Sequence, residues 1–362
     1  MKYQYWLANV PGITNRILLE MIRSAGSAEE VYHLKCDQLQ KLCKMNGSLT
    51  QQLQESKAQW NVEQEYEKLQ EKNIRFITQE SGAYPYSLRN IADAPYGIYV
   101  MGELPTFEQK SVAIIGARMC SEYGRMMATE IGKRLAGYGV TVISGMARGI
   151  DAAGHLGALN GGGKTCAVLG CGVDVCYPES NRELYRQMVE QGCVISEYPP
   201  GQQPKPWCFP ARNRIISALS DIVVVVEAKE RSGSLITADF ALEQGKDVYA
   251  VPGRTTDTLS RGCNQLIRQG AGIITNIDEF MEDLKLCVVH REFQENFNKL
   301  LLEKDESLVY SCVDLRPKSV EELMRNTGYT CQRLADVLQS LIQKDLVCEC
   351  FKNFYIRKNE IC

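Results

Sequence analysis

The sequence lacks any long apolar segment. Its longest purely apolar run extends only from Ile222 to Val226, whereas a membrane-spanning helix needs roughly 20 apolar residues. The N-terminus, Met1 to Gln4, is not followed by the apolar stretch and small-residue cleavage site of a secretory signal. These two absences predict a cytoplasmic protein that has no membrane partner.

Metal-binding patterns are missing as well. The sequence has three histidines, and its 15 cysteines include no C-x-x-C pair. Cys166, Cys171 and Cys176 are five residues apart, which is not a spacing that zinc sites use. We therefore expect no metal site and no cofactor. Many cysteines in a chain without an export signal indicate a reducing compartment, in which thiols stay free.

The chain also has no excess of positive charge. Its net charge is -3, whereas proteins that bind nucleic acid through their overall charge are usually basic. Any binding of nucleic acid must therefore come from a local cluster of Lys and Arg side chains.

Three regions differ in their hydrophobic pattern, and the first is helical. Residues 1–75 are polar, with apolar positions at helical spacing such as Ile17, Met21 and Leu39. The turn Val10-Pro11-Gly12-Ile13 before a helix is typical of a helix-hairpin-helix or a similar small helical domain, such as a sterile alpha motif (SAM). The alternative is a helical docking domain that uses Pro-Gly as a simple turn.

Residues 76–285 alternate short apolar runs with helical segments. The runs are almost continuous in Val and Ile, as strands buried on both faces should be. This alternation predicts an α/β fold with a doubly wound, Rossmann-like parallel sheet, in which ligands bind at the carboxyl ends of the strands. The predicted strands are Val112–Ile115, Val140–Ser144, Cys166–Leu169, Val194–Ser196, Ile222–Val226, Val248–Val251 and Gly272–Ile274.

The third region predicts a winged helix. Residues 286–304 are charged and indicate a linker, and residues 305–362 follow the order helix, turn, helix, hairpin. Such a unit binds duplex DNA or protein, and both interpretations stay open because the second helix offers only Gln332 and Arg333 for reading bases. The predicted elements are a helix from Val320 that Gly328 ends, a helix from Cys331 to Gln343, and two strands joined through Lys352-Asn353.

Glycine-containing loops follow the first two strands of the predicted sheet. Gly116-Ala117-Arg118 precedes a helix, and this arrangement predicts an anion site formed by backbone N–H groups, the helix dipole and a guanidinium. The second loop contains Gly145 and Arg148 ahead of Asp151. Two interpretations of Arg148 stay open: a contact with phosphate, or a brace for Asp151 or for an end of the sheet.

The segment 199–220 combines cations with aromatic side chains and has no acidic residue. Aromatic rings that stack bases, with cations for the backbone, are the features of single-strand binding without sequence preference. Its prolines, among them Pro210, are expected to hold the loop extended, and Phe209 is expected to be partly exposed. The cations and aromatic residues are Lys205, Trp207, Phe209, Arg212 and Arg214.

A further small-residue loop, Ser232-Gly233-Ser234 with Thr237, suits either phosphate binding or simple capping by Ser234. No catalytic set emerges. His155 follows Asp151 by one helical turn, but no Ser or Cys nucleophile is paired with it. We therefore expect a binding protein rather than an enzyme.

Five motifs resemble the DNA-processing protein A family (DprA, also called Smf). They are Gly116-Ala117-Arg118 through Tyr123-Gly124, SGMARGIDAAGHLGAL, AVLGCGVDVCYPESN, FPARNRIISALS and SGSLITADFALEQGKDVYAVPG. The resemblance covers about residues 76–285 and implies an extended Rossmann fold. It also implies a homodimer that binds single-stranded DNA without sequence preference, protects incoming strands and helps to load the bacterial recombinase during natural transformation.

The resemblance also implies roles for single residues. It places DNA contacts on Arg118, Lys205 and the FPARNR segment, and contacts with a second copy or the recombinase around Leu266 and Ile267. The family usually has Ser or Thr where this chain has Ala117, a loss on the order of 1 kcal/mol for one hydroxyl contact. The whole predicted DNA-binding surface comprises Gly116, Ala117, Arg118, Gly145, Arg148, Lys205, Phe209, Arg212, Asn213, Arg214, Ser232, Gly233, Ser234 and Thr237.

Two other functions compete with this interpretation. A nucleotide-binding hydrolase of the lysine-decarboxylase-like (LOG) group shares a Rossmann core, and its PGGxGTxxE motif carries a catalytic glutamate. The corresponding stretch here reads SGSLITADF, with Asp239 near that place. The second alternative is a scaffold whose winged helix alone binds DNA.

Overall fold

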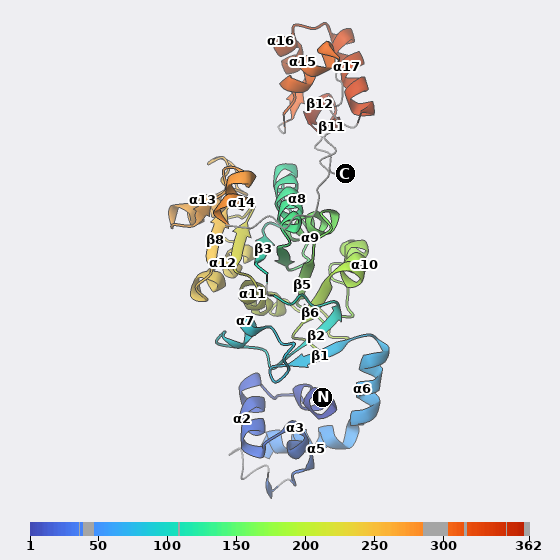
Figure 1. Cartoon of the computed structure of the whole chain (residues 1–362), viewed down its shortest axis with the longest axis vertical. Helices are drawn as coiled ribbons and strands as arrows, with labels where there is room; N and C mark the ends of the chain where they lie inside the picture. Colours follow the sequence, from blue (N-terminus) through green and yellow to red (C-terminus); the bar gives the residue numbers. More distant parts are fainter. Residues whose placement is uncertain are drawn as a thin grey trace. The chain divides into compact units, whose positions relative to one another are not determined.

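We describe the protein from a computed structural model, which covers residues 1–35, 37–38, 47–107, 109–284, 303–314, 317–344 and 346–357. Contacts between residues divide the chain into two units, Met1–Arg291 and Glu292–Cys362, each of which we describe by itself (Figure 1). Over the described ranges, no helix combines the length and the apolar character needed to cross a membrane.

The first unit is built on one sheet with the strand order β1-β2-β6-β5-β4-β3-β7-β8-β9. The strands from β6 to β9 in this order run parallel to their neighbours, and β1 and β2 extend the sheet with antiparallel pairs. The strands are β1 (Arg75–Thr78), β2 (Gly97–Gly102), β3 (Ser111–Ile115), β4 (Thr141–Ser144), β5 (Thr165–Leu169), β6 (Cys193–Ser196), β7 (Ile222–Val225), β8 (Asp247–Ala250) and β9 (Gly272–Ile273).

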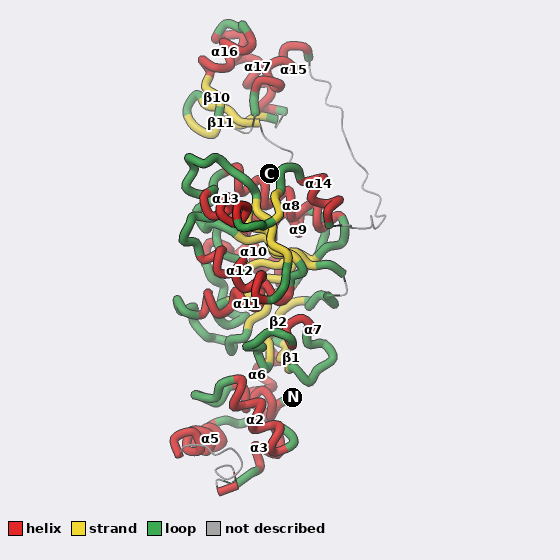
Figure 2. Tube along the Cα trace, turned by 90° about the vertical axis from the view of Figure 1, so that its left-hand side faces the viewer, coloured by secondary structure: helices red, strands yellow, loops and turns green. Residues whose placement is uncertain are grey.

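Helices cover both faces of this sheet. One layer consists of α8 (Glu122–Gly137), α9 (Ile150–Asn160), α10 (Arg182–Gln191) and α14 (Ile277–Asp283), and the other of α7 (Tyr86–Arg89), α11 (Cys208–Leu219), α12 (Gly233–Glu243) and α13 (Arg261–Arg268). Figure 2 shows α8, α9 and α14 on one side of the strands, with α11, α12 and α13 on the other. The predicted α/β fold with a mainly parallel sheet is therefore confirmed.

The pattern of the central strands explains the two layers. All side chains of β3 are buried, and alternate residues point to opposite faces. Val112 and Ile114 pack with α8 and α9, whereas Ala113 and Ile115 pack with α11 and α12. Apolar residues are thus required on both faces of the strand from Val112 to Ile115.

The described helices of the N-terminal region share a core with the sheet. Trp6 is fully buried in the same apolar cluster as Tyr99 of β2 and Leu184 of α10, and Asn9 Nδ2 donates to the Tyr99 hydroxyl at 2.8 Å. The expected apolar position Leu39 lies outside the described residues. The helices are α1 (Lys2–Ala8), α2 (Asn15–Ala25), α3 (Ala28–His33), α5 (Gly47–Gln59) and α6 (Val62–Glu71).

The second unit contains the two predicted helices and the hairpin, and before them a helix and a short strand that were not predicted. Gly328 ends α16 in the left-handed conformation, with φ 71°, and Asn353 in the hairpin turn has φ 64°. Most of the predicted linker, residues 286–302, lies outside the described residues. The elements are α15 (Lys304–Cys312), β10 (Lys318–Ser319), α16 (Val320–Thr327), α17 (Cys331–Gln343), β11 (Val347–Phe351) and β12 (Phe354–Arg357), with the three strands in the order β10-β12-β11.

Candidate nucleic-acid interface

The loops after β3 and β4 touch at the carboxyl edge of the large sheet. Ile150 N donates to Ala117 O at 3.3 Å. Gly149 has φ 78°, and a Cβ atom there would lie 2.3 Å from Ala117 O, so only glycine fits this contact. The predicted glycine loops therefore lie side by side.

The Asp151 side chain connects these loops through hydrogen bonds to their backbone amides. Its buried carboxylate accepts hydrogen bonds from Gly145 N at 3.2 Å and Ala147 N at 3.4 Å, and also from the Gly116 backbone. Burial raises the pKa of Asp151, against the lowering influence of Arg212 and the amides. Arg148 does not brace this carboxylate: it is exposed, and its Nε donates to Ser180 Oγ at 3.1 Å.

Arg212 is not part of the exposed surface. Its side chain is buried, and Nη1 donates to Val168 O at the end of β5. The guanidinium lies so close to Gly145 that a Cβ atom there would be 2.2 Å from Nη1. Burial lowers the pKa of Arg212. The prediction that Arg212 lines an open phosphate pocket is therefore wrong, and its observed contacts support the loop after β4.

Arg214 and Asn213 also make internal contacts. Arg214 is buried, and its Nη2 donates to both carboxylate oxygens of Glu197 at 2.9 Å. Asn213 Nδ2 donates to Gly233 O at 3.2 Å, which ties α11 to the start of α12. The expectation that Arg214 faces the DNA-binding surface is wrong, because helical periodicity turns it toward Glu197.

A row of exposed groups remains at this edge. The rings of Tyr177 and Phe209 lie 5.4 Å apart between centroids, tilted by 32°. The Arg118 guanidinium carbon lies 5.5 Å from the Phe209 centroid, as in a cation–π contact. Tyr177 is 41% exposed and Phe209 is half-buried. We call these three residues the aromatic platform. The expected partial exposure of Phe209 is confirmed.

Lys205 and Trp207 form a second exposed pair just before α11. Lys205 Nζ lies 5.4 Å from the Trp207 ring centroid, and Trp207 is 66% exposed. Pro210 does not extend the loop as expected, because it lies in the first turn of α11, where its missing N–H costs nothing. In the described part of the chain, no ion pair involves Arg118 or Lys205, in contrast to Arg214.

The start of α8 is not an open anion site. Ser121 caps this helix, and its N–H donates to Glu227 Oε2 at 2.8 Å. Ala117 N donates to Glu227 O at 2.7 Å. Glu227 therefore already uses the amides of Ala117 and Ser121, which we expected to face a phosphate.

The start of α12 is largely closed as well. Ser232, not Ser234, caps the helix, and the two hydroxyls are 2.7 Å apart. Ser234 and Thr237 are buried, whereas Gly233 is exposed. Capping thus accounts for the hydroxyls of this loop, and only its backbone near Gly233 faces solvent.

Two expected contact residues on α13 differ in exposure. Leu266 is 6% exposed and belongs to the core between α13 and the sheet, and Ile267 is partly buried against it. A partner that binds here would meet the exposed side of α13, so direct contact by Leu266 is contradicted by its burial.

His155 has a structural environment. Its Nδ1 lies 2.6 Å from Thr165 Oγ1, which donates to Val142 O, and burial lowers the pKa of His155 to about 3. No group of metal-ligating side chains with a suitable arrangement occurs among the described residues.

Residues 75–285 match the family model of DNA recombination-mediator protein A. The chain belongs to this family. The suspected DprA/Smf membership is thereby confirmed.

Individual DprA/Smf relatives agree with this assignment. The chain is 44% identical to DNA processing protein DprA of Streptococcus pneumoniae over 202 residues, which cover 56% of this chain and 71% of the relative. It is 34% identical to protein Smf of Synechocystis over 77% of this chain and 72% of the relative.

Solved DprA structures have the same fold. The X-ray structure of DprA from Streptococcus pneumoniae aligns with a TM-score of 0.69 at 34% identity, covering 78% of this chain and 98% of that one. A structure that concerns the single-stranded DNA binding mode of DprA from Helicobacter pylori aligns with a TM-score of 0.54 at 30% identity, covering 58% of this chain and 96% of that one.

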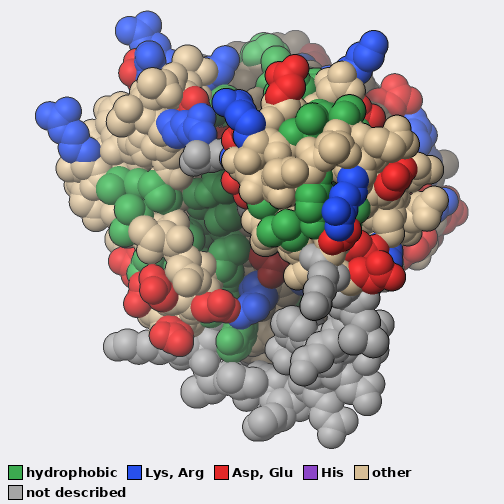
Figure 3. All heavy atoms as spheres, turned by 90° about the horizontal axis from the view of Figure 1, so that it is seen from above, with side chains coloured by type: hydrophobic (Ala, Val, Ile, Leu, Met, Phe, Trp, Pro, Cys, Tyr) green, Lys and Arg blue, Asp and Glu red, His purple; other side chains and the backbone are tan. Residues whose placement is uncertain are grey.

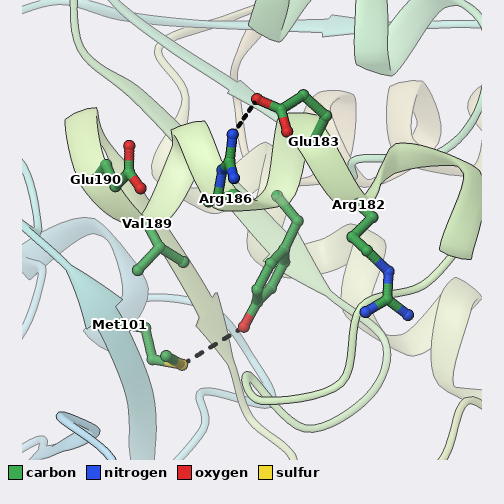
Figure 4. Close-up of a pocket in the computed structure, with 7 residues that line it drawn as sticks. Met101, Arg182, Glu183, Arg186, Val189 and Glu190 are labelled. Carbon is green, nitrogen blue, oxygen red and sulfur yellow. Dashed lines mark hydrogen bonds and ion pairs between the residues drawn. The ribbon is translucent and has the colours of Figure 1, made fainter.

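One cavity among the described residues lies elsewhere. It measures about 390 Å³ and is shallow, with Met101 of β2 opposite Arg186 and Val189 of α10 (Figure 4). Arg182 and Arg186 at this cavity are each ion-paired with a glutamate of the same segment. On the face drawn in Figure 3, basic and acidic side chains are interspersed. Arg118 and Lys205 differ from the two arginines at the cavity because no ion pair involves them in the described part of the chain.

Two important side chains were missed from the sequence. Tyr177 follows Cys176 in the AVLGCGVDVCYPESN motif, and an exposed aromatic before a proline could have drawn attention to it. Glu227 directly follows the most apolar strand. An isolated acidic residue at the end of a strand could have indicated a carboxylate that binds the N-terminus of a neighbouring helix.

Proposed function

We propose that this DprA family member binds single-stranded DNA without sequence preference at the carboxyl edge of its large sheet. The observation that carries the proposal is the aromatic platform: two partly exposed rings next to the exposed guanidinium of Arg118. Lys205 and Trp207 supply a second cation and ring at the same edge.

The chemistry of this surface favours a single strand. Every base has a π face that stacks on an aromatic ring, so stacking tolerates any sequence but requires unpaired bases. Arg118 and Lys205 are exposed cations beside these rings and suit the intervening phosphates. The buried Arg212 adds positive charge beneath the loops without touching the strand.

The family supports a wider role. We infer that the protein processes DNA during natural transformation, protects incoming strands in the cytoplasm and helps to load a recombinase. We further propose that it acts as a homodimer through the exposed side of α13 near Ile267. The N-terminal helices, which suit a helix-hairpin-helix or SAM-like domain, are proposed to support the sheet rather than to bind DNA, since they share its core.

The order of elements in the second unit supports a winged helix. We propose that its second helix does not read bases, because Arg333 is ion-paired with Asp305 at 2.6 Å and lies 4.4 Å from the Tyr329 centroid. This arrangement favours a protein-binding role for the unit over binding of duplex DNA.

We propose a binding function rather than catalysis. In the LOG-type alternative, an acidic residue of α12 would act on a nucleotide, and Asp239 is the candidate. It is exposed on the helix, while the hydroxyls of Ser234 and Thr237 near the helix start are buried. When the full chain is incubated with nucleoside monophosphates, we expect no release of free base.

Fluorescence anisotropy tests the main proposal. The full chain is titrated into a labelled single-stranded oligonucleotide and into the matching duplex, each at two salt concentrations. The wild type is expected to prefer the single strand, with an affinity that falls as salt rises. Lys205→Glu should remove most of this binding.

Lys164→Glu is the matched control. Lys164 lies just before β5, at the opposite edge of the sheet, and its side chain is similarly exposed. The same reversal of charge there should leave binding almost unchanged. Equal effects of both variants, or equal affinity for both DNA forms, would contradict the proposed site.

A further inference from the structure

The order in which strands are added to the sheet reverses between β3 and β7. From β3 the sheet grows toward β4, and from β7 it grows toward β8. In doubly wound sheets this switch point is the usual place for a nucleotide, whose phosphate binds at the start of the adjacent helix. Here that helix is α8, with Ser121 as its cap.

The position that a phosphate would take at α8 is filled by a carboxylate of the same chain. Glu227 is 5% exposed and accepts hydrogen bonds from both the N–H and the hydroxyl of Ser121. Its negative charge lies at the positive end of the α8 dipole, where an anion is stabilised. Glu227 thus uses the donors and the electrostatic field that would attract a phosphate.

The surrounding chain is shaped to hold this carboxylate. Gly124 faces it from the first turn of α8, and a Cβ atom there would lie 2.4 Å from Glu227 Cδ. On the other side, the loop is fixed by Ala228 N donating to Leu259 O at 2.7 Å and by Gly262 N donating to Ala228 O at 2.8 Å. A phosphate can enter only by displacing a fixed carboxylate from its hydrogen bonds, or by lying against a like charge.

We infer that Glu227 is a specificity-determining residue that excludes the phosphate of free nucleotides from the switch point. The inference deepens the proposed function and rests on it, because it leaves the strand to bind only on the outer surface of Arg118, Lys205 and the rings. Free nucleotides therefore compete poorly with a strand. A strand compensates for the closed phosphate site by making several outer contacts at once, which a mononucleotide cannot do.

Isothermal titration calorimetry with thymidine monophosphate tests this inference on the full chain. The wild type should bind it weakly or not at all. Glu227→Ala and Glu227→Gln should both gain affinity, on the order of tenfold for removal of one close like charge. The gain should persist when Arg118→Ala is added, because the nucleotide then uses the start of α8 rather than the outer surface.

Glu230→Gln provides the matched control. Glu230 lies in the same loop, but it is exposed and pairs with Arg261 at 3.9 Å. Its neutralisation removes the same charge without opening the start of α8, so the affinity for thymidine monophosphate should not change. An equal gain in this variant would show a general charge effect and overturn the inference.

Other outcomes separate the two proposals. Wild-type binding as tight as that of Glu227→Ala, or no gain in either variant, would overturn the role of Glu227. Circular dichroism checks folding, and Glu227→Gln keeps the volume and one acceptor oxygen if the alanine variant is unstable. Failure of the wild type to bind single-stranded DNA in parallel would reject the proposed function, yet a nucleotide gain in the variants would still support the exclusion.

Discussion

Two pairs of cations at the carboxyl edge of the sheet come from one predicted surface but have opposite environments. Arg118 and Lys205 are exposed beside aromatic rings. Arg212 and Arg214 are buried and donate to Val168 O and to Glu197. The difference shows that the number of basic residues in a segment does not predict which of them lie on a binding surface. The phase of α11 turns Arg212 and Arg214 inward, whereas Arg118 and Lys205 lie in loops and stay exposed.

The largest expected effect separates the two pairs by stability. Arg214→Met should lower the free energy of unfolding by about 3–5 kcal/mol, because it leaves the largely buried Glu197 carboxylate without its ion-pair partner and with Asn15 as a remaining donor. Urea unfolding of the full chain measures this change. The affinity of the remaining folded protein for single-stranded DNA should stay close to that of the wild type.

A double variant sharpens this prediction. Arg214→Met combined with Glu197→Met should recover much of the lost stability, since neither charge is then buried alone. Strongly reduced DNA affinity in a stable double variant would show that Arg214 contributes to DNA binding. The contrast between the exposed and the buried cations would then be wrong.

The second effect concerns the platform. Phe209→Ala should weaken single-strand binding by about 1–3 kcal/mol, the range found for loss of one stacked base contact. Phe209→Tyr should keep most of the affinity, because the ring remains. Anisotropy titrations at one salt concentration measure both variants, and similar losses for the two would argue against stacking.

A smaller effect is expected from the exposed arginine. Arg118→Ala should weaken binding of all sequences by about 1 kcal/mol and reduce the salt slope by about 0.7, as for loss of one phosphate contact on a single strand. Arg125→Ala is the control, because Arg125 is also exposed, on α8, but pairs with Glu122 at 3.5 Å. An unchanged slope in folded Arg118→Ala would remove this residue from the site.

The smallest effect should appear in the second unit, where charges make internal contacts. Hydrogen bonds from Lys344 and Ser340 lower the pKa of Glu306 to about 2. An unfolded Glu has a pKa of about 4.3, so this stabilisation is complete above that pH and is lost as the pH falls toward 2.

Hydrogen exchange of peptides from α15 and α17, corrected for the intrinsic rate at each pH, follows this change in the full chain. Protection should fall as the solution is acidified through this window, and Glu306→Gln should flatten the dependence. The same substitution should leave single-strand binding at neutral pH unchanged. A large change in binding would give the second unit a direct part in strand recognition.

Much of the fold could be predicted because its central strands are unambiguous. Runs of Val and Ile such as Ile222–Val225 suit only a strand buried on both faces. By contrast, β1 and β2 were missed. β1 is a four-residue strand that begins with an exposed Arg75, and its connection to β2 contains α7 rather than a short turn. Their pairing depends on β6, a contact far along the chain that local patterns do not encode.

The site was predicted in part for a related reason. Lys205 and Phe209 precede or begin α11, so their exposure did not depend on helical phase. The expected extended loop placed Arg212 and Arg214 on the same surface, but α11 begins at Cys208 and turns both inward. The contact between Tyr177 and Phe209 joins two distant segments. Only the assembled sheet brings such residues together.

The pairing of β2 has a consequence for how the chain is made. Gly97–Gly102 pairs with Cys193–Ser196, and β3 completes its neighbours only with Ile222–Val225. During synthesis from the N-terminus, the ribosome releases β2 and its neighbour β1 long before β6, the other partner of β2, exists. The core of the N-terminal helices therefore stays incomplete until the residues that finish it, such as Leu184 and Val194, have been synthesised. Early termination before Val225 is expected to leave a fragment with unpaired apolar strands, which chaperones and proteases would remove.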